Sequence, residues 1–265
     1  MSFNYGILDD VAHRPWPLPN RPWMMTQTWH DLLFAHWPVD RALLASKIPR
    51  GLELDLHDGQ AWLGVVPFRM SHVTPRGVPA IRRLSAFPEL NVRTYVRAAG
   101  APGVYFFSLD AAHLEAVMIA RALLHLPYRL AAMSVERDGS RICYRSRRTS
   151  FSTRAAFTAT YAPTGPARSA DPSSLDYFLT ERYCLYTVRG RGGPRRLDIH
   201  HQPWPLQPAT AMFECNTMAD AIGVPLPSSP PVLHFAKRLD VLAWAPRPLE
   251  GAGDSVSRET AIERL

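Results

Sequence analysis

The stretch that decides the fold is ELNVRTYVR at residues 89–97, followed after a Gly/Pro break by GVYFFSL at residues 103–109. The first segment alternates, so that one face carries Glu89, Asn91, Arg93, Tyr95 and Arg97, and the other carries Leu90, Val92, Thr94 and Val96. A period of two predicts a β-strand, and the aromatic run predicts its partner. The Ala-rich segment that follows is predicted to be a helix, with Ser108 or Asp110 as its N-cap and its end before Pro127.

Strand-like segments and turns recur along the whole chain. Asp58-Gly59 and Asp138-Gly139 predict tight turns between strand pairs. Short helices are predicted for RALLASKI after the N-cap Asp40, for SSLDYFLT, and for MFECNTMADAI, which ends at Gly223. Roughly ten strands against three or four helices predict a mainly β (α+β) protein whose sheet closes, or nearly closes, to hide its edges.

The chain is predicted to hold a single large domain. Residues 1–21 are Pro-rich and lack a period, which predicts an N-terminal arm laid over the surface. Residues 22–248 keep the same alternation of strands and turns and are predicted to form the domain. Residues 249–265 are polar without an apolar face and are predicted to be a flexible tail.

Charge and composition restrict the partners. The formal net charge is +7, yet only two of the 30 basic residues are lysines, and no nucleic-acid-binding module is recognisable. We therefore expect solvated arginines and no nucleic-acid partner. Three widely spaced cysteines predict neither a disulfide framework nor a zinc site. Without a signal-like start or a long apolar run, a cytoplasmic protein without a membrane partner is expected.

Several strings carry a resemblance to a known family. In chain order they are WHDLLFAHWPV, HDGQAWLGVVPFRM, FPELNVRTYV, PGVYFFSLDA, HLPY, FLTERYCLY, IHHQPWPLQ and PPVLHFAKRLDVLAW. They span about residues 29–248 and resemble the YqjF-like uncharacterised family, domain of unknown function 2071, which is related in fold to acetoacetate decarboxylase. The resemblance implies an antiparallel, cone-shaped β-barrel with a few peripheral helices and an internal cavity.

The same resemblance tests a mechanism. Acetoacetate decarboxylases carry a YPKKL-like segment whose first Lys forms a Schiff base while the adjacent Lys lowers its pKa. The similar segment here is LPYRL, so Tyr128 stands in the place of the first Lys and Arg129 in that of the second. Since neither a phenol nor a guanidinium forms an imine with a ketone, Schiff-base decarboxylation at this position is excluded.

The two lysines of the chain do not restore that chemistry. Lys47 lies in an amphipathic segment, where its stem is expected to cover apolar surface. Lys237 is followed by Arg238 on a predicted strand, where adjacent residues point to opposite faces, so the two are not expected to share a pocket.

The candidate site is built around residues 89–97. The ligand-binding candidates are Arg93, Asn91, Tyr95 and Arg129, and the catalytic candidates are Tyr128 and Glu89. Arg93 suits a carboxylate because its guanidinium can bind both oxygens. Alternation alone leaves a second interpretation open, in which the apolar face points into the barrel and the polar face is solvated.

Other titratable residues have simpler interpretations. Glu181 and Arg182 are interpreted as an internal ion pair at the start of a strand, in preference to an acid–base role. His200 and His201 are adjacent and cannot both bind one ion on a strand, so no metal is expected. No nucleotide- or dinucleotide-binding glycine motif occurs, and no cofactor is expected.

The leading hypothesis is a barrel that binds a small acidic or carbonyl-bearing compound. If it is an enzyme, an imine-independent lyase, isomerase or hydrolase is expected. The alternative is a non-catalytic ligand-binding or assembly protein. The sequence leaves the ligand and the oligomeric state open, a homo-oligomer included.

Overall fold

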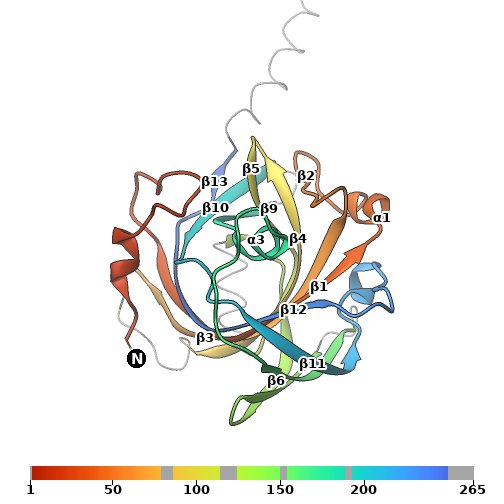
Figure 1. The fold of residues 1–265 in the computed structure, drawn as a ribbon. Helices are drawn as coiled ribbons and strands as arrows, with labels where there is room; N and C mark the ends of the chain where they lie inside the picture. The colour runs from red at the N-terminus through yellow and green to blue at the C-terminus, as the bar shows by residue number, and fades with distance from the viewer. Residues whose placement is uncertain (1, 79–85, 114–123, 150–153, 189–192, 250–265) are drawn as a thin grey trace, which may run out of the picture.

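The computed structural model describes residues 2–78, 86–113, 124–149, 154–188 and 193–249 (Figure 1). The strands are β1 (Met25–Val39), β2 (Glu53–Leu54), β3 (Ala61–Pro75), β4 (Phe87–Ala98), β5 (Ala101–Ala111), β6 (Tyr128–Asp138), β7 (Arg141–Arg148), β8 (Ala156–Pro163), β9 (Cys184–Val188), β10 (Pro194–His200), β11 (Gln207–Asn216), β12 (Val232–Ala243) and β13 (Arg247–Pro248). The helices are α1 (Arg41–Ala45) and α3 (Leu175–Thr180), with 3-10 helices η1 (Tyr5–Asp9) and η2 (Asp220–Ile222).

The strands close into two rings that share a wall. One ring, the cavity ring, runs β1-β3-β4-β5-β9-β10-β12 and returns to β1. The other, the core ring, leaves the shared wall at β5, runs through β6-β7-β8-β11 and returns at β12. Most pairings are antiparallel, but β5 pairs with β6 and with β9 in parallel. The predicted mainly β barrel is confirmed, and its sheet is mixed.

The wall that the two rings share consists of β12, β1, β3, β4 and β5, and β4 is buried on both faces along most of its length. Glu89, Asn91 and Arg93 on β4 line a cavity inside the cavity ring. Leu90 and Val92, at the alternate positions, belong to an apolar cluster inside the core ring. The second interpretation is right that the apolar face points into an interior but wrong that the polar face is solvated, because each face points into a different interior.

Helix α3 lies within the outline of the strands in Figure 1 rather than on the periphery. Ser174 caps its start by accepting a hydrogen bond from the backbone N–H of Tyr177. Its last carbonyls face inward, where Arg182 Nε donates to the Phe178 carbonyl at 2.8 Å and Tyr95 Oη donates to the Leu179 carbonyl at 2.6 Å. Side chains of the barrel thus satisfy helix carbonyls that have no partner within the helix.

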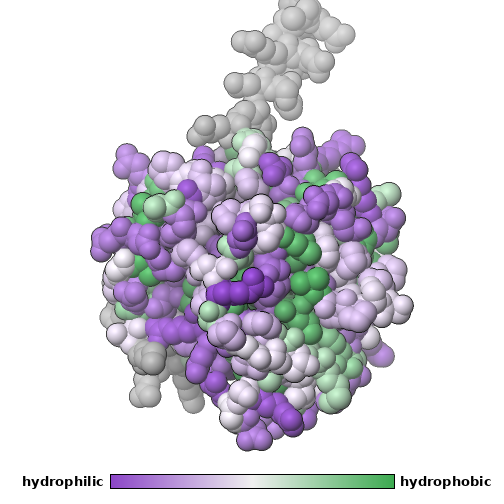
Figure 2. Space-filling model, in the orientation of Figure 1, coloured by the Kyte–Doolittle hydropathy of each residue, from purple (hydrophilic) through white to green (hydrophobic). Residues whose placement is uncertain are grey.

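The N-terminal arm is held against β10 and β12. Arg14 donates to the Ile199 carbonyl at 2.8 Å, His200 Nε2 lies 2.6 Å from the Ile7 carbonyl, and Asn4 N donates to Asp240. The exposed face in Figure 2 is mostly hydrophilic, with a hydrophobic area beside α3. No helix in the described part of the chain is long and apolar enough to cross a membrane.

Several local predictions are confirmed. Asp58 and Gly59 both have positive φ, as a tight turn requires, and Gly139 lies in the β6–β7 hairpin. Asp40 caps α1 by accepting from the backbone N–H of Leu43 at 2.6 Å. Gly223 follows η2 in the left-handed conformation.

Other predictions are wrong. MFECN is part of β11 and not of a helix, because Ala209, Ala211 and Phe213 alternate inward while Met212 is 62% exposed. Strand β2 pairs with β4 rather than with β3. The remaining differences concern the segment after β4.

Ser108 and Asp110 do not cap a helix, because both lie in β5 and bind the guanidinium of Arg148. The helix predicted after them falls largely in residues 114–123, outside the described residues. The tail predicted from residue 249 likewise falls outside them from residue 250 onward.

Candidate functional site

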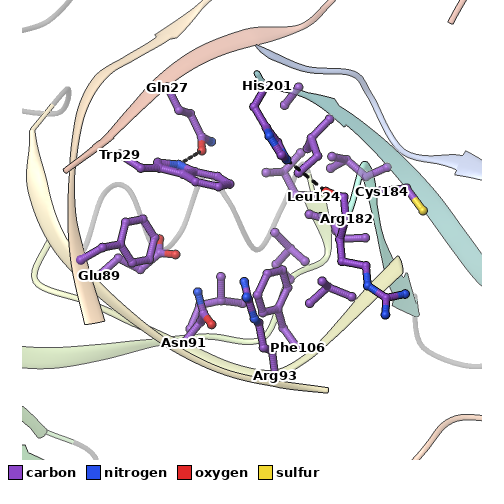
Figure 3. A pocket seen from close by; sticks show the side chains of 18 of the residues that line it. Gln27, Trp29, Glu89, Asn91, Arg93, Phe106, Leu124, Arg182, Cys184 and His201 are labelled. Carbon is purple, nitrogen blue, oxygen red and sulfur yellow. Dashed lines mark hydrogen bonds between the residues drawn. The ribbon is translucent and has the colours of Figure 1, made fainter. Parts of the chain in front are cut away.

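A cavity of about 80 Å³ lies inside the cavity ring (Figure 3). Its polar and charged lining residues are Gln27, Glu89, Asn91, Arg93, Tyr128, Thr180, Arg182 and His201. Apolar side chains, among them Trp29, Phe106 and Trp204, complete the wall. Figure 3 shows Asn91 and Arg93 on one side of the cavity, with Gln27, Trp29 and His201 across from them. This combination of apolar walls and a few polar groups is typical of small-molecule sites.

Among the described residues, Arg93 is a cation of the cavity wall that forms no ion pair with a carboxylate. Its side chain is buried, at 7% exposure, and its guanidinium carbon lies 5.0 Å from the ring centre of Phe34. Nη2 donates to the Leu179 carbonyl at 3.2 Å, while the buried Nε has no hydrogen-bond partner in the described structure. A buried guanidinium without a counterion favours an anionic ligand.

Two further polar atoms of the wall are unpaired among the described residues. Asn91 Oδ1 and Trp204 Nε1 are both buried without a hydrogen-bond partner. Buried polar atoms are almost always hydrogen-bonded in native proteins, so such atoms on a cavity wall indicate groups that meet a ligand or water. Together with Arg93 Nε, they offer two donors and one acceptor.

Glu89 and Tyr128 form a buried pair at the other end of the polar wall. The phenol of Tyr128 donates to Glu89 Oε2 at 2.7 Å. Burial raises the pKa of Glu89 from 4.5 to about 8, although the hydrogen bond from Tyr128 opposes this shift. Burial, and then the charge of Glu89, keep the pKa of Tyr128 well above its ordinary value. At neutral pH this carboxyl is therefore mostly protonated.

Arg182 was not predicted to belong to the site. It does not pair with Glu181; its Nη1 donates instead to Asp55 Oδ2 at 2.6 Å. Glu181 accepts hydrogen bonds from Tyr183 Oη and from the backbone N–H of Trp204. Glu181 lies in the turn that ends α3, with φ of −84° and ψ of 80°, and the backbone N–H of Arg182 donates to the Thr180 carbonyl at 3.0 Å, so strand alternation does not apply to these two residues.

Two predicted ligand contacts lie elsewhere. Tyr95 is buried behind Arg93, with the centre of its ring 5.8 Å from the guanidinium carbon of Arg93. Its phenol donates to the Leu179 carbonyl, so His36 Nε2, 2.6 Å away, is the donor to the phenol oxygen. Arg129 does not line the cavity, because it neighbours Tyr128 on β6 and points to the opposite face.

Neither lysine of the sequence lines the cavity. Lys47 lies near Gly223, and Lys237 borders a separate surface groove. Arg238 borders that groove as well, so the prediction that the two would not share a pocket is wrong. The reason is that β12 has no described strand partner on one edge between its pairings with β11 and with β10, so a groove at this edge reaches both faces.

The histidines of the described structure do not form a metal centre. No group of three His, Cys, Asp or Glu side chains in the described ranges could hold a metal ion. His201 lines the cavity, and burial lowers its pKa to about 4, so it is neutral at pH 7. Burial raises the pKa of the Cys184 thiol to about 11, which keeps that group protonated.

Solved structures with this fold share little sequence with the chain. MppR, an enduracididine biosynthesis enzyme complexed with pyruvate, gives a TM-score of 0.59 at 13% identity, over 86% of this chain and 91% of that one. Acetoacetate decarboxylase from Legionella pneumophila gives 0.58 at 17% identity, over 94% and 98%. These likenesses establish an acetoacetate decarboxylase-like fold.

The comparison with curated protein sequences gives a much higher identity. The uncharacterized protein YqjF of Bacillus subtilis (strain 168) is 50% identical over 227 residues, which cover 86% of this chain and 93% of that protein. The family DUF2071, described as an uncharacterized conserved protein, matches residues 26–240. The chain therefore belongs to the DUF2071 family and has an acetoacetate decarboxylase-like barrel.

Proposed function

We propose that the cavity binds a small carboxylic acid that also carries a carbonyl group, and that the protein transfers a proton on this compound without forming an imine. The observation that carries the proposal is the pairing, in one cavity, of an uncompensated buried guanidinium with a protonated carboxyl group. The two lie on the same face of β4, with Asn91 between them.

Arg93 holds the carboxylate of the ligand. Asp55 forms ion pairs with both Arg182 and Arg97, and Glu89 and His201 are neutral at pH 7. The charge of Arg93 therefore gives the cavity a net positive charge. The unpaired Nε adds a donor for a carboxylate oxygen. The volume of about 80 Å³ limits the ligand to roughly five to eight water-sized groups, at about 10–15 Å³ for each.

Glu89 exchanges the proton. With a pKa of about 8, both of its forms are populated near neutral pH, as general acid–base catalysis requires. In its ionised form it removes a proton from the carbon next to the ligand carbonyl, and the electron pair of that C–H bond moves to the carbonyl oxygen to give an enolate. In its protonated form it returns the proton to carbon. Tyr128 holds Oε2 through its hydrogen bond.

The comparisons support the ligand class. MppR has this fold and was solved with pyruvate, a small acid with a ketone. The absence of lysine from the lining agrees with chemistry that needs no imine, since both lysines lie outside the cavity. Pyruvate is accordingly the first probe.

Calorimetry and proton exchange test the proposal together. Pyruvate should bind the wild type, and Arg93→Gln should weaken binding at least tenfold, since a hydrogen bond to a charged group contributes about 1.5–3 kcal/mol. Arg145→Gln is the matched control, because Arg145 is half-exposed and pairs with Glu136 outside the cavity. In D2O, NMR should show enzyme-dependent deuteration of the methyl group of pyruvate or of a 2-oxo acid homologue.

The variants Glu89→Gln and Tyr128→Phe separate catalysis from binding. Both should still bind the probe, while Glu89→Gln should abolish deuteration and Tyr128→Phe should slow it. Binding without any deuteration in the wild type would support the rival function, a non-catalytic ligand-binding barrel. Binding that Arg93→Gln leaves unchanged would contradict the proposed site itself.

A further inference from the structure

A second hollow lies outside the cavity, on the surface where β1, β3 and β12 run side by side. It has a volume of about 630 Å³. Its described lining residues are His30, Asp31, Arg69, Ser71, His72, Arg137, Ala167, Pro205, Gln207, Lys237 and Arg238. This volume falls in the range of small-molecule sites, and none of these residues belongs to the cavity described above. We name it the basic groove.

The floor of the basic groove is a row of three basic side chains across three strands. In the strand register His30 of β1 stands opposite Arg69 of β3 on one side and opposite Arg238 of β12 on the other. Like charges on neighbouring strands repel each other. Burial and both guanidiniums lower the pKa of His30 to about 4, so the imidazole is neutral at pH 7 between two cations.

Carboxylates hold the arginines of the groove in place. Asp31 is buried and forms ion pairs with Arg69 and with Arg137, the latter at 3.4 Å. Arg238 Nη2 lies 3.1 Å from Oδ2 of Asp240, two residues further along β12. Guanidiniums fixed in this way keep further N–H groups for a ligand and lose little side-chain freedom on binding.

Hydroxyl and imidazole groups continue the polar floor. Ser71 Oγ lies 2.7 Å from His30 Nε2 and 2.9 Å from His72 Nδ1. Asp31 and His72 both have left-handed backbone conformations, with φ of 51° for each. Such conformations are costly for residues other than glycine and concentrate at functional sites. Both residues lie at register shifts of the β1–β3 pairing, so they mark β-bulges that shape the groove.

The net positive charge of the groove matches the charge of a dianion in magnitude. Four cations border it, namely Arg69, Arg137, Lys237 and Arg238, and Asp31 and Asp240 neutralise two of these charges. Lys237 is exposed and has no ion-pair partner among the described residues. A phosphomonoester carries a charge of about −1.5 to −2 at pH 7, which matches the remaining charge of +2.

We propose that the basic groove is a second binding site and that it takes a small molecule carrying a phosphomonoester group. Arg69, Arg137 and Lys237 bind the phosphate oxygens, and the remaining volume accepts the organic part. A nucleic-acid strand fits less well, because no Phe, Tyr or Trp is found among the described lining residues to stack on bases.

The test is a titration of the full chain with phenyl phosphate and with inorganic phosphate, followed by calorimetry at 50 mM and 150 mM salt. Phenyl phosphate should bind saturably at one site. Lys237→Gln should weaken it at least threefold, and Arg137→Gln by a similar factor. Lys47→Gln removes the same charge at the other lysine and should leave the affinity unchanged. Arg93→Gln should also leave it unchanged, which separates this site from the cavity.

Four results would overturn the proposal. The first is the absence of saturable phenyl phosphate binding, and the second is an equal loss of affinity in Lys237→Gln and Lys47→Gln. The third is loss of phenyl phosphate binding in Arg93→Gln. The fourth is an eight-nucleotide single strand that binds more tightly than phenyl phosphate and is weakened by Lys237→Gln. Thermal unfolding of each variant shows that it is folded; Lys237 has an exposed side chain, so its replacement should not change the melting temperature.

Discussion

Gly64 and Arg93 are register partners on adjacent strands, and the stem of Arg93 lies over the backbone of Gly64. A Cβ placed on Gly64 would lie 3.3 Å from Arg93 Cγ and 2.9 Å from His36 Cδ2 on the other side. The missing side chain makes room for the imidazole and the guanidinium stem together. The position of Arg93 therefore depends on a glycine of the next strand.

Gly64→Ala should displace Arg93 and His36 together. Because both neighbours are buried and close-packed, we expect a loss of about 1–3 kcal/mol in the free energy of unfolding. Pyruvate affinity should fall with it, since Arg93 moves. Gly165→Ala is the control: its Cβ would meet only Pro208, at 3.3 Å, far from the cavity. Urea unfolding and calorimetry measure the two effects, and unchanged affinity in a folded Gly64→Ala would contradict this role.

Glu89 should make the protein less stable in alkali. Its pKa is raised to about 8 in the folded state from 4.5, so the folded state binds the proton more tightly. The free energy of unfolding should therefore fall as pH rises from about 5, with the full loss reached above pH 8. The loss is on the order of 5 kcal/mol.

Glu89→Gln provides the check on that titration. The amide is neutral at every pH, so the variant should lack this slope and should exceed the wild type in stability at pH 9. Urea unfolding at pH 6, 7.5 and 9 measures it. Parallel pH profiles for the two proteins would show that Glu89 ionises without cost in the folded state.

Borohydride should trap no imine. Neither Lys47 nor Lys237 lines the cavity, and the positions that resemble the lysine pair of acetoacetate decarboxylases hold Tyr128 and Arg129. Intact-mass spectrometry after treatment with pyruvate and borohydride should give the unmodified mass. A stable adduct on either lysine would sink the imine-independent mechanism.

The buried ion pair between Arg148 and Asp110 should be sensitive to loss of one partner. Arg148 Nε donates to Asp110 Oδ2 at 2.9 Å, and its Nη2 donates to Ser108 Oγ at 2.6 Å. Arg148→Met leaves the carboxylate buried and unpaired, which should cost about 3–5 kcal/mol in the free energy of unfolding. The double variant with Asp110→Leu should recover most of that loss in urea unfolding. Additive losses would contradict a coupled pair.

Local sequence signals were sufficient for much of the fold. Strict alternation identified β4, the two Asp-Gly pairs identified turns, and Asp40 identified the start of α1. These features depend on neighbouring residues only, so they can be read without tertiary contacts. The resemblance to a known family supplied the barrel, and the solved structures confirm it.

The wrong predictions concern segments whose structure depends on contacts between residues far apart in the sequence. The segment MFECNTMADAI was predicted to be a helix, yet its first residues belong to β11, where Met212 is exposed and the alanines and Phe213 point inward. Asp110 looked like a helix cap, but its partner Arg148 lies 38 residues away on β7. Among the site candidates, alternation placed Glu89, Asn91 and Arg93 on one face, but it could not reveal Arg182, because that residue reaches the cavity from the segment after α3.

The two faces of β4 hold two sets of positions that belong to different interiors. Glu89, Asn91 and Arg93 line the cavity, whereas Leu90 and Val92 belong to the apolar cluster of the core ring, so each set faces a different interior. A substitution at one of the three cavity positions therefore changes the cavity wall without changing the apolar cluster behind it. MppR and the Legionella pneumophila acetoacetate decarboxylase keep this fold at 13% and 17% identity to the chain.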